Sequence, residues 1–116
     1  SNKETGILEI NLRVLEWKYS REHCGHIEFY PERGLEDVEF TIYKDGKVYK
    51  KQRTNQSGKV DFQLPLGVYT YKQTSKYPAT TVENYLPDST IFSVIISPDQ
   101  RFNQHTLYNA YSRFFS

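Results

Sequence analysis

The chain lacks several features that would place it in particular classes of protein. It has 116 residues, no methionine and one cysteine, Cys24, and its apolar runs are no longer than a strand. A membrane-spanning helix needs about 20 apolar residues, so the sequence predicts no membrane span. One cysteine cannot form an intramolecular disulfide bond, and it fits either a reducing compartment or an exported protein that folds without disulfides. The cysteine count therefore leaves the compartment open.

An excess of positive charge is also missing. The chain has 15 Lys and Arg residues against 14 Asp and Glu residues, which gives a formal net charge of +1. Dedicated nucleic-acid binders carry a larger positive excess, so nucleic acid is not an expected partner. The sequence also has no glycine-rich phosphate loop, no serine-centred nucleophile elbow and no paired-acid motif. We therefore predict that the protein is not an enzyme and needs no cofactor.

Aromatic side chains, by contrast, are abundant in an otherwise polar chain. Only 37% of the residues are hydrophobic and the mean hydropathy is −0.72, yet 16% are aromatic. A buried Phe or Tyr removes about 150–250 Å² of surface from water, which helps to offset the entropy that keeps polar segments disordered. We expect an ordered domain whose core is carried by aromatic rings. The length fits one domain over residues 7–116, preceded by a polar tether over residues 1–6.

Alternation of apolar and polar residues predicts short β-strands along the chain. The first strand is marked by Leu8, Ile10, Leu12 and Val14, each separated by one polar residue. Similar strand-like segments occur over residues 38–42, 48–53, 60–64, 68–74, 91–97 and 104–112. Asp45-Gly46 predicts a tight hairpin, and Pro78 and Pro87 predict a loop over residues 75–90. With no helical periodicity, the pattern indicates an all-β sandwich of about seven strands.

Four motifs follow one another in an order that is typical of one family. They are Gly34 to Tyr43 with the Lys44-Asp45-Gly46 hairpin, T-x-x-x-G-x-V from Thr54 to Val60, L-P-x-G-x-Y from Leu64 to Tyr69, and Leu107 to Tyr111 with its central Asn. The segment from Gly34 to Tyr111 resembles a Cna B-type (SpaA-like, prealbumin-like) domain of Gram-positive surface proteins and pilins. This resemblance implies an immunoglobulin-like or prealbumin-like β-sandwich.

The resemblance also implies a site at which this chain departs from the family. Many such domains carry an isopeptide bond between a Lys on the first strand and an Asn on the last, promoted by a buried Glu. The corresponding positions here are Leu12 for the lysine, Asn109 for the asparagine and Gln73 for the acid. Lys18 has suitable strand parity, but it lies further along the chain than the lysine position of the family. A carboxamide cannot shuttle the proton that this reaction needs. We predict a vestigial isopeptide site, in which Gln73 and Asn109 form a hydrogen-bonded pair.

The segment from Trp17 to Arg33 has no counterpart in short members of the family. Insertions at the end of a sandwich, where loops cluster, often carry specific surfaces. Four aromatic residues of this insertion are candidate binding residues: Trp17, Tyr19, Phe29 and Tyr30. Their rings could stack on a sugar or on a protein partner, or they could instead pack the insertion onto the sandwich.

Two further clusters have ordinary explanations beside functional ones. His23, Cys24 and His26 offer three ligands to a metal, but zinc sites usually need four protein ligands or three plus water, so the sequence predicts no metal site. A basic cluster surrounds the predicted hairpin at Lys44, Lys47, Lys50, Lys51, Arg53 and Lys59. It could bind anionic glycans, or it could protect an exposed strand from edge-to-edge pairing.

These patterns lead to one functional hypothesis and two alternatives. We expect a non-catalytic, extracytoplasmic adhesion or structural module of a bacterial cell-surface protein or lipoprotein, either cell-associated or secreted, with a protein or glycan partner at the cell surface. Residues 1–6 resemble the polar tether behind an acylated cysteine, so one interpretation places a lipid anchor upstream of Ser1 and the other a plain boundary. The alternatives are a carbohydrate-binding module and a small metal-binding or ligand-binding protein.

Overall fold

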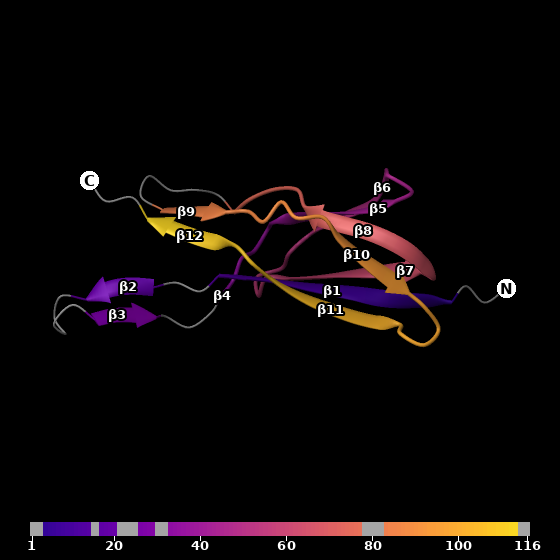
Figure 1. The fold of residues 1–116 in the computed structure, drawn as a ribbon, viewed down its shortest axis with the longest axis horizontal. Helices are drawn as coiled ribbons and strands as arrows, with labels where there is room; N and C mark the ends of the chain where they lie inside the picture. The colour runs from indigo at the N-terminus through magenta and orange to yellow at the C-terminus, as the bar shows by residue number, and fades with distance from the viewer. Residues whose placement is uncertain (1–3, 15–16, 21–25, 30–32, 78–82, 114–116) are drawn as a thin grey trace.

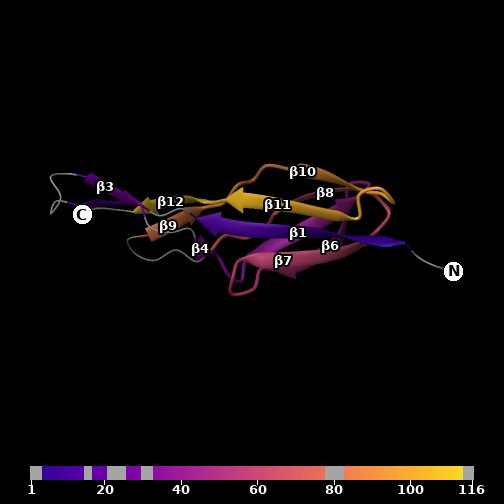
Figure 2. The same ribbon diagram turned by 90° about the horizontal axis from the view of Figure 1, so that it is seen from below.

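The structure, a computed structural model, describes residues 4–14, 17–20, 26–29, 33–77 and 83–113, and every regular element in them is a strand. Two four-stranded sheets pack face to face as a sandwich, and two further strand pairs lie outside them. Figures 1 and 2 show this arrangement in two views. The all-β prealbumin-like sandwich expected from the sequence is thus confirmed.

The first sheet is built around the long strand β1 (Thr5–Val14). On one side β1 pairs in parallel with β11 (Phe102–Tyr108). On its other side it pairs antiparallel with β7 (Lys59–Pro65) and, near its end, with the short β4 (Arg33–Gly34). The first strand predicted from alternation is therefore central to its sheet, and its uniformly apolar face packs into the core between the two sheets.

The second sheet is antiparallel throughout and has the order β10–β8–β5–β6. Its strands are β5 (Glu39–Lys44), β6 (Lys47–Arg53), β8 (Gly67–Gln73) and β10 (Phe92–Ile96). Asp45 and Gly46 join β5 to β6 with φ angles of 52° and 77°. Two consecutive positive φ angles are those of the two-residue hairpin that the Asp-Gly sequence predicts.

The core lies between these two sheets and is mostly aliphatic. In β1 every second side chain is buried, from Leu8 to Val14. The aromatic side chains in the buried cluster are Phe40, Phe62, Tyr69 and Tyr71, and the other members are Leu, Ile and Val. The expectation that aromatic rings carry the core is therefore wrong among the described residues. Several of the rings lie at the surface, including those of Tyr49, Phe102 and Tyr108.

Two sequence predictions of element boundaries are wrong. The loop expected over residues 75–90 contains β9 (Glu83–Leu86), and the last predicted strand divides at Asn109 into β11 and β12 (Ala110–Arg113). β9 pairs antiparallel with β12. A four-residue strand held by a partner far along the chain leaves no local alternation long enough to be recognised.

The molecule is longer than a compact domain of its size. Its extents are 64 × 25 × 21 Å and its radius of gyration is 17.3 Å, compared with about 13 Å for a compact domain of 100 residues. The extra length comes from β9–β12 and from a second pair formed by β2 (Trp17–Ser20) and β3 (His26–Phe29). Figure 1 shows both pairs beyond the end of β1, opposite to the end at which β1 begins. None of the described residues belongs to a helix that could cross a membrane.

Candidate functional site

The structure brings Gln73 and Asn109 together between the two sheets. Gln73 ends β8 with 6% of its surface exposed, and Asn109, with 2% exposed, separates β11 from β12. The Gln73 Nε2 group donates to Asn109 Oδ1 over 2.8 Å, and Asn109 Nδ2 donates to Gln73 Oε1 over 2.8 Å. The two carboxamides therefore face each other in the hydrogen-bonded pair that strand parity predicts.

Further hydrogen bonds hold each member of this pair. Gln73 Nε2 donates a second hydrogen bond to the carbonyl of Ser75 over 2.8 Å, so both hydrogens of its amide are used. The backbone N–H of Asn109 donates to the carbonyl of Arg13 over 3.1 Å, which ties the end of β11 to the end of β1. Buried polar groups without partners cost about 1–3 kcal/mol each, and this arrangement avoids that cost.

The described inward face of β1 presents no amine to this pair. Its buried positions are Gly6, Leu8, Ile10, Leu12 and Val14. Leu12, the position at which the resemblance places the lysine, lies opposite Leu107 of β11. Lys18 is in β2, where it pairs with Glu28 outside the two main sheets. The site thus has an amide where the promoting acid is expected and an apolar side chain where the lysine is expected.

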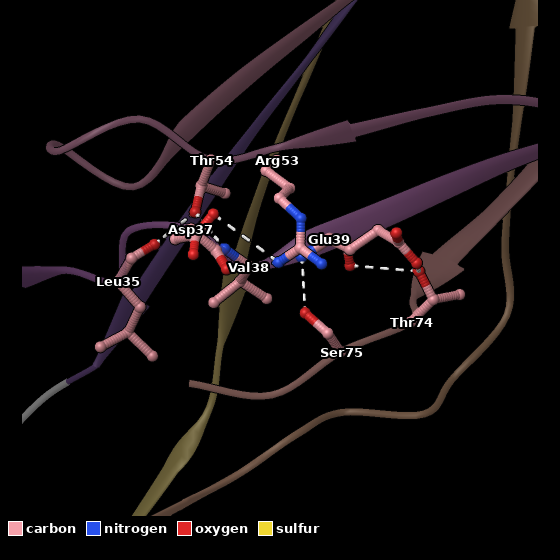
Figure 3. Close-up of polar contacts among 8 residues, drawn as sticks. All are labelled: Leu35, Asp37, Val38, Glu39, Arg53, Thr54, Thr74 and Ser75. Carbon is pink, nitrogen blue, oxygen red and sulfur yellow. Dashed lines mark hydrogen bonds and ion pairs between the residues drawn. The ribbon is translucent and has the colours of Figure 1, made fainter. Parts of the chain in front are cut away.

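A hydroxyl and carboxylate network fixes the backbone beside Gln73. Thr74 Oγ1 donates to Glu39 Oε1 over 2.6 Å and lies 2.8 Å from Thr41 Oγ1. Ser75 Oγ accepts the backbone N–H of Glu39 over 2.7 Å. Figure 3 shows that the side chains of Thr74 and Ser75, which follow β8, point toward Glu39. Sequence reasoning missed these residues because their partners are more than 30 residues away along the chain.

The T-x-x-x-G-x-V motif has a structural role at the same end of the sandwich. Thr54 Oγ1 donates to the carbonyl of Leu35 over 2.6 Å and accepts the N–H of Val38 over 3.0 Å (Figure 3). Gly58 has a φ of +81°, and a Cβ added there would lie 2.4 Å from the carbonyl oxygen of Leu12. The motif therefore clamps the segment that leads into β5 against β1, and only glycine fits its close approach.

Three of the four aromatic residues proposed for binding lie on the β2–β3 pair at one end of the molecule. Trp17 pairs with Phe29 and Tyr19 pairs with Ile27, whereas Tyr30 lies outside the described residues. Figures 1 and 2 both show this pair extending away from the sandwich along the long axis. The structure thus gathers three of the four candidate binding residues on one projecting strand pair, for which we use the name arm (Trp17–Ser20 and His26–Phe29).

The two remaining candidate clusters are a possible metal site and the basic cluster. His23 and Cys24 lie outside the described residues, and the part of the chain that the structure describes contains no group of three potential metal ligands. In the basic cluster, Lys59 lies 3.3 Å from Glu9 and Arg53 lies 3.7 Å from Asp37. Lys44 Nζ sits 5.4 Å above the ring of Tyr69, and Lys50 Nζ donates to the carbonyl of Gln63 over 3.4 Å, so four of the six basic side chains have local partners.

Sequence reasoning also missed a second polar pair between β8 and β11. The hydroxyl of Tyr71 lies 2.8 Å from Nδ1 of His105, and the ring of Phe92 packs edge-on against His105 with centroids 4.5 Å apart. Burial raises the pKa of Tyr71 to about 12. Burial also lowers the pKa of His105, although the carboxylate of Asp88 acts in the opposite direction. No local pattern marks this pair, because 34 residues separate its members.

Comparison with known proteins identifies the family of this fold. The sequence profile of the SpaA prealbumin-like fold domain matches residues 30–110. Among solved structures, the chain is similar to the Bacillus anthracis TIE protein, with 27% identity and a TM-score of 0.66 over 91% of this chain and 17% of that one. A search among curated proteins finds no match.

Two pilin subunits share the fold at lower identity. The minor pilin GBS52 of Streptococcus agalactiae has 16% identity and a TM-score of 0.65, over 97% of this chain and 47% of that one. The major pilin subunit BcpA of Bacillus cereus has 19% identity and a TM-score of 0.62, over 91% of this chain and 30% of that one. The present chain thus spans less than half of each of these proteins. From the profile match and the fold together, the chain belongs to the SpaA family of prealbumin-like domains.

Proposed function

We propose that this domain is a non-catalytic structural or adhesion module of a bacterial cell-surface protein or lipoprotein, located outside the cytoplasm. The observation that carries the proposal is its elongated form, in which β1 begins at one end and β12 ends near the other (Figure 1). A module of this shape adds length to a chain when it is placed in series with other domains. Its match to the SpaA family supports the same assignment.

The surface location can be tested directly on cells. Antibodies raised against the domain should bind intact, unpermeabilised cells of the bacterium that produces it. An antibody against a cytoplasmic protein should stain the same cells only after permeabilisation. If the domain behaves like the cytoplasmic control, the proposal of a surface module fails.

We place the contact with a surface partner, a protein or a glycan, on the arm. The supporting observation is that Trp17, Tyr19 and Phe29 lie on a strand pair that projects from the sandwich, where a large ligand can approach. The carbohydrate-binding alternative uses the same residues, because aromatic rings stack on sugars as they do on protein side chains. Glycan-array and cell-binding assays should lose signal for Trp17→Ala but not for Tyr49→Ala, which removes an exposed ring from β6. Equal binding by both variants contradicts a site on the arm.

We interpret Gln73 and Asn109 as the vestigial counterpart of the family's covalent cross-link. The reciprocal hydrogen bonds and the apolar inward face of β1 support this interpretation. Without a carboxylic acid and a facing amine, the condensation that releases ammonia has neither its promoter nor its nucleophile. The intact mass of the purified protein should therefore equal the mass of its sequence. A mass lower by one ammonia, located by peptide mapping to Asn109, contradicts the interpretation.

A further inference from the structure

The two edges of the second sheet differ in their chemistry. One edge is β6, which carries Lys47, Lys50, Lys51 and Arg53 within seven residues. The other edge is β10, and residues 89–98 around it contain no charged side chain. Lysines on an edge strand hinder pairing with the edge of another sheet, because their charges would be desolvated and brought together. The β10 edge has no such protection, and among the described residues β8 is the only strand that pairs with it.

The outer face of the sheet beside β10 is apolar and exposed. Ile91 is 64% exposed, and Ile95 is 61% exposed. Ile95 lies opposite Val68 of β8, which is 60% exposed, so the apolar strip continues onto the next strand. A strand laid against this edge covers Ile91 and Ile95, whereas Val68 lies one strand further in and stays outside the contact.

Along its edge β10 borders a groove of about 520 Å³ that it shares with β11. Leu8 and Tyr71 contribute to the lining from the two sheets, and Phe92 and His105 contribute from the two strands at its rim. No Lys, Arg, Asp or Glu side chain lines this groove. A charged segment placed here would lose its hydration without gaining a counter-charge, so the groove favours an uncharged, extended occupant.

We propose that this edge binds the β10 strand of a second copy of the chain. A two-fold axis through the edge makes the two β10 strands antiparallel. The same residues of both copies then form the contact, so each copy supplies an uncharged edge to the other. The segment from Ser89 to Pro98 supplies the uncharged, β-branched strand that the edge and groove favour. The second sheet of one copy and the second sheet of the other then form one continuous sheet through backbone hydrogen bonds.

Charge argues against the other edge of this sheet as the contact. Pairing β6 with β6 places Lys50 and Lys51 of one copy near the same residues of the other. Pairing β6 with β10 sets basic side chains against Ile91 and Ile95 without a counter-charge. Only the β10 to β10 contact unites two edges of the second sheet without burying a charge.

The test is sedimentation equilibrium of the whole chain across a range of concentrations. We expect wild type to show a reversible monomer–dimer equilibrium, and Ile95→Lys to weaken dimerisation by about tenfold or more. Val68→Lys is the matched control, since it adds the same charge to the same face but on an inner strand. Thr106→Lys is the second control, because it adds a lysine to β11, the other strand that borders the groove. Circular dichroism establishes that each variant is folded.

Hydrogen exchange supplies a readout that depends on the backbone. Amides of residues 92–96 should exchange more slowly as the concentration of wild type rises, because edge N–H groups acquire partners in the dimer. Ile95→Lys should abolish that concentration dependence and Val68→Lys should retain it. The proposal is overturned if wild type stays monomeric, if Val68→Lys weakens the dimer as strongly as Ile95→Lys, or if Thr106→Lys has the largest effect. A monomeric chain would leave the surface-module assignment untouched, since that assignment rests on the elongated form and the family match and is tested by location on cells.

Discussion

Two polar pairs connect β8 with the region of β11, and they differ in what they can do. Gln73 and Asn109 are almost fully buried and carry no charge at any ordinary pH. In the second pair Tyr71 is buried and His105 partly buried, and both side chains titrate. Each pair spans more than 30 residues of sequence, yet the pairs lie two residues apart on β8. The comparison indicates that the first contributes constant stability, whereas the second makes stability depend on pH.

The largest effect should come from giving the neutral pair a charge. Gln73→Glu places a carboxyl group beside the Oδ1 atom of Asn109, and burial raises the pKa of such a group. We expect a loss of about 3 kcal/mol in unfolding free energy near pH 8, because the carboxylate is then charged in the unfolded state and disfavoured in the buried site. Because the folded state then holds its proton more tightly than the unfolded state, stability should recover as the pH falls toward 4. Urea unfolding at several pH values measures this.

The control for that substitution is the wild-type protein. Its stability should not depend on pH through position 73, because the amide of Gln73 does not titrate. If Gln73→Glu unfolds with the same free energy at pH 8 and at pH 4, the site is more hydrated than the structure indicates. A mass lower by one ammonia in Gln73→Glu would show instead that the acid alone restores the cross-link, with a lysine reaching Asn109.

Removal of one partner from the neutral pair should have the next largest effect. Asn109→Ala leaves the Oε1 atom of Gln73 without its donor and should cost about 1–3 kcal/mol, measured by thermal or urea unfolding. Asn109→Leu should cost less, because an apolar side chain recovers part of the packing. Melting of Asn109→Ala within error of wild type would mean that the pair contributes nothing.

A smaller effect is expected at the titratable pair. Tyr71→Phe removes the hydroxyl that contacts His105 and should cost about 1 kcal/mol at neutral pH, since the ring still packs. The pKa of Tyr71 is raised to about 12, above the ordinary value of about 10. The unfolded state therefore loses its proton first, so wild-type stability should fall as the pH rises from 10 toward 12. Tyr71→Phe should show a weaker fall over this range.

The smallest effect concerns acid pH. Burial lowers the pKa of His105, so the unfolded state takes up a proton at a higher pH than the folded state does. Stability from this residue is complete above about pH 6.5, its ordinary pKa, and declines as the pH falls from there to the lower folded value. His105→Gln should reduce that decline, whereas His26→Gln, on the arm, serves as a control. Identical acid profiles for wild type and His105→Gln would show that His105 is hydrated in the folded protein.

The neutral pair was accessible to sequence reasoning for a physical reason. Successive side chains on a strand alternate between two faces, so Gln73 had to share the buried face of Tyr69 and Tyr71. The same rule placed Asn109 with Leu107. The order of the family motifs then placed the two strands in opposite sheets. Together with alternation, this predicted that Gln73 faces Asn109.

The titratable pair shows where such reasoning ends. Alternation along β8 places Tyr71 on the same face as Tyr69 and Gln73, but no local pattern marks His105 as its partner. Nothing in the sequence around His105 specifies that β11 pairs with β1 in parallel, and that pairing is what brings its ring to Tyr71. β9 was missed for the same reason, because its partner β12 is supplied by the tertiary structure.

The sequence by itself determined the strand-forming segments, the Asp45-Gly46 hairpin and the inward faces, because alternation and turn chemistry are local properties of the backbone. It also determined that an amide replaces an acid at position 73. Only the tertiary structure decided which strands became edges, and therefore that β6 presents its lysines to solvent while the uncharged β10 borders an open groove. Edges depend on the order of strands within a sheet, and that order is set by contacts between residues far apart in the chain.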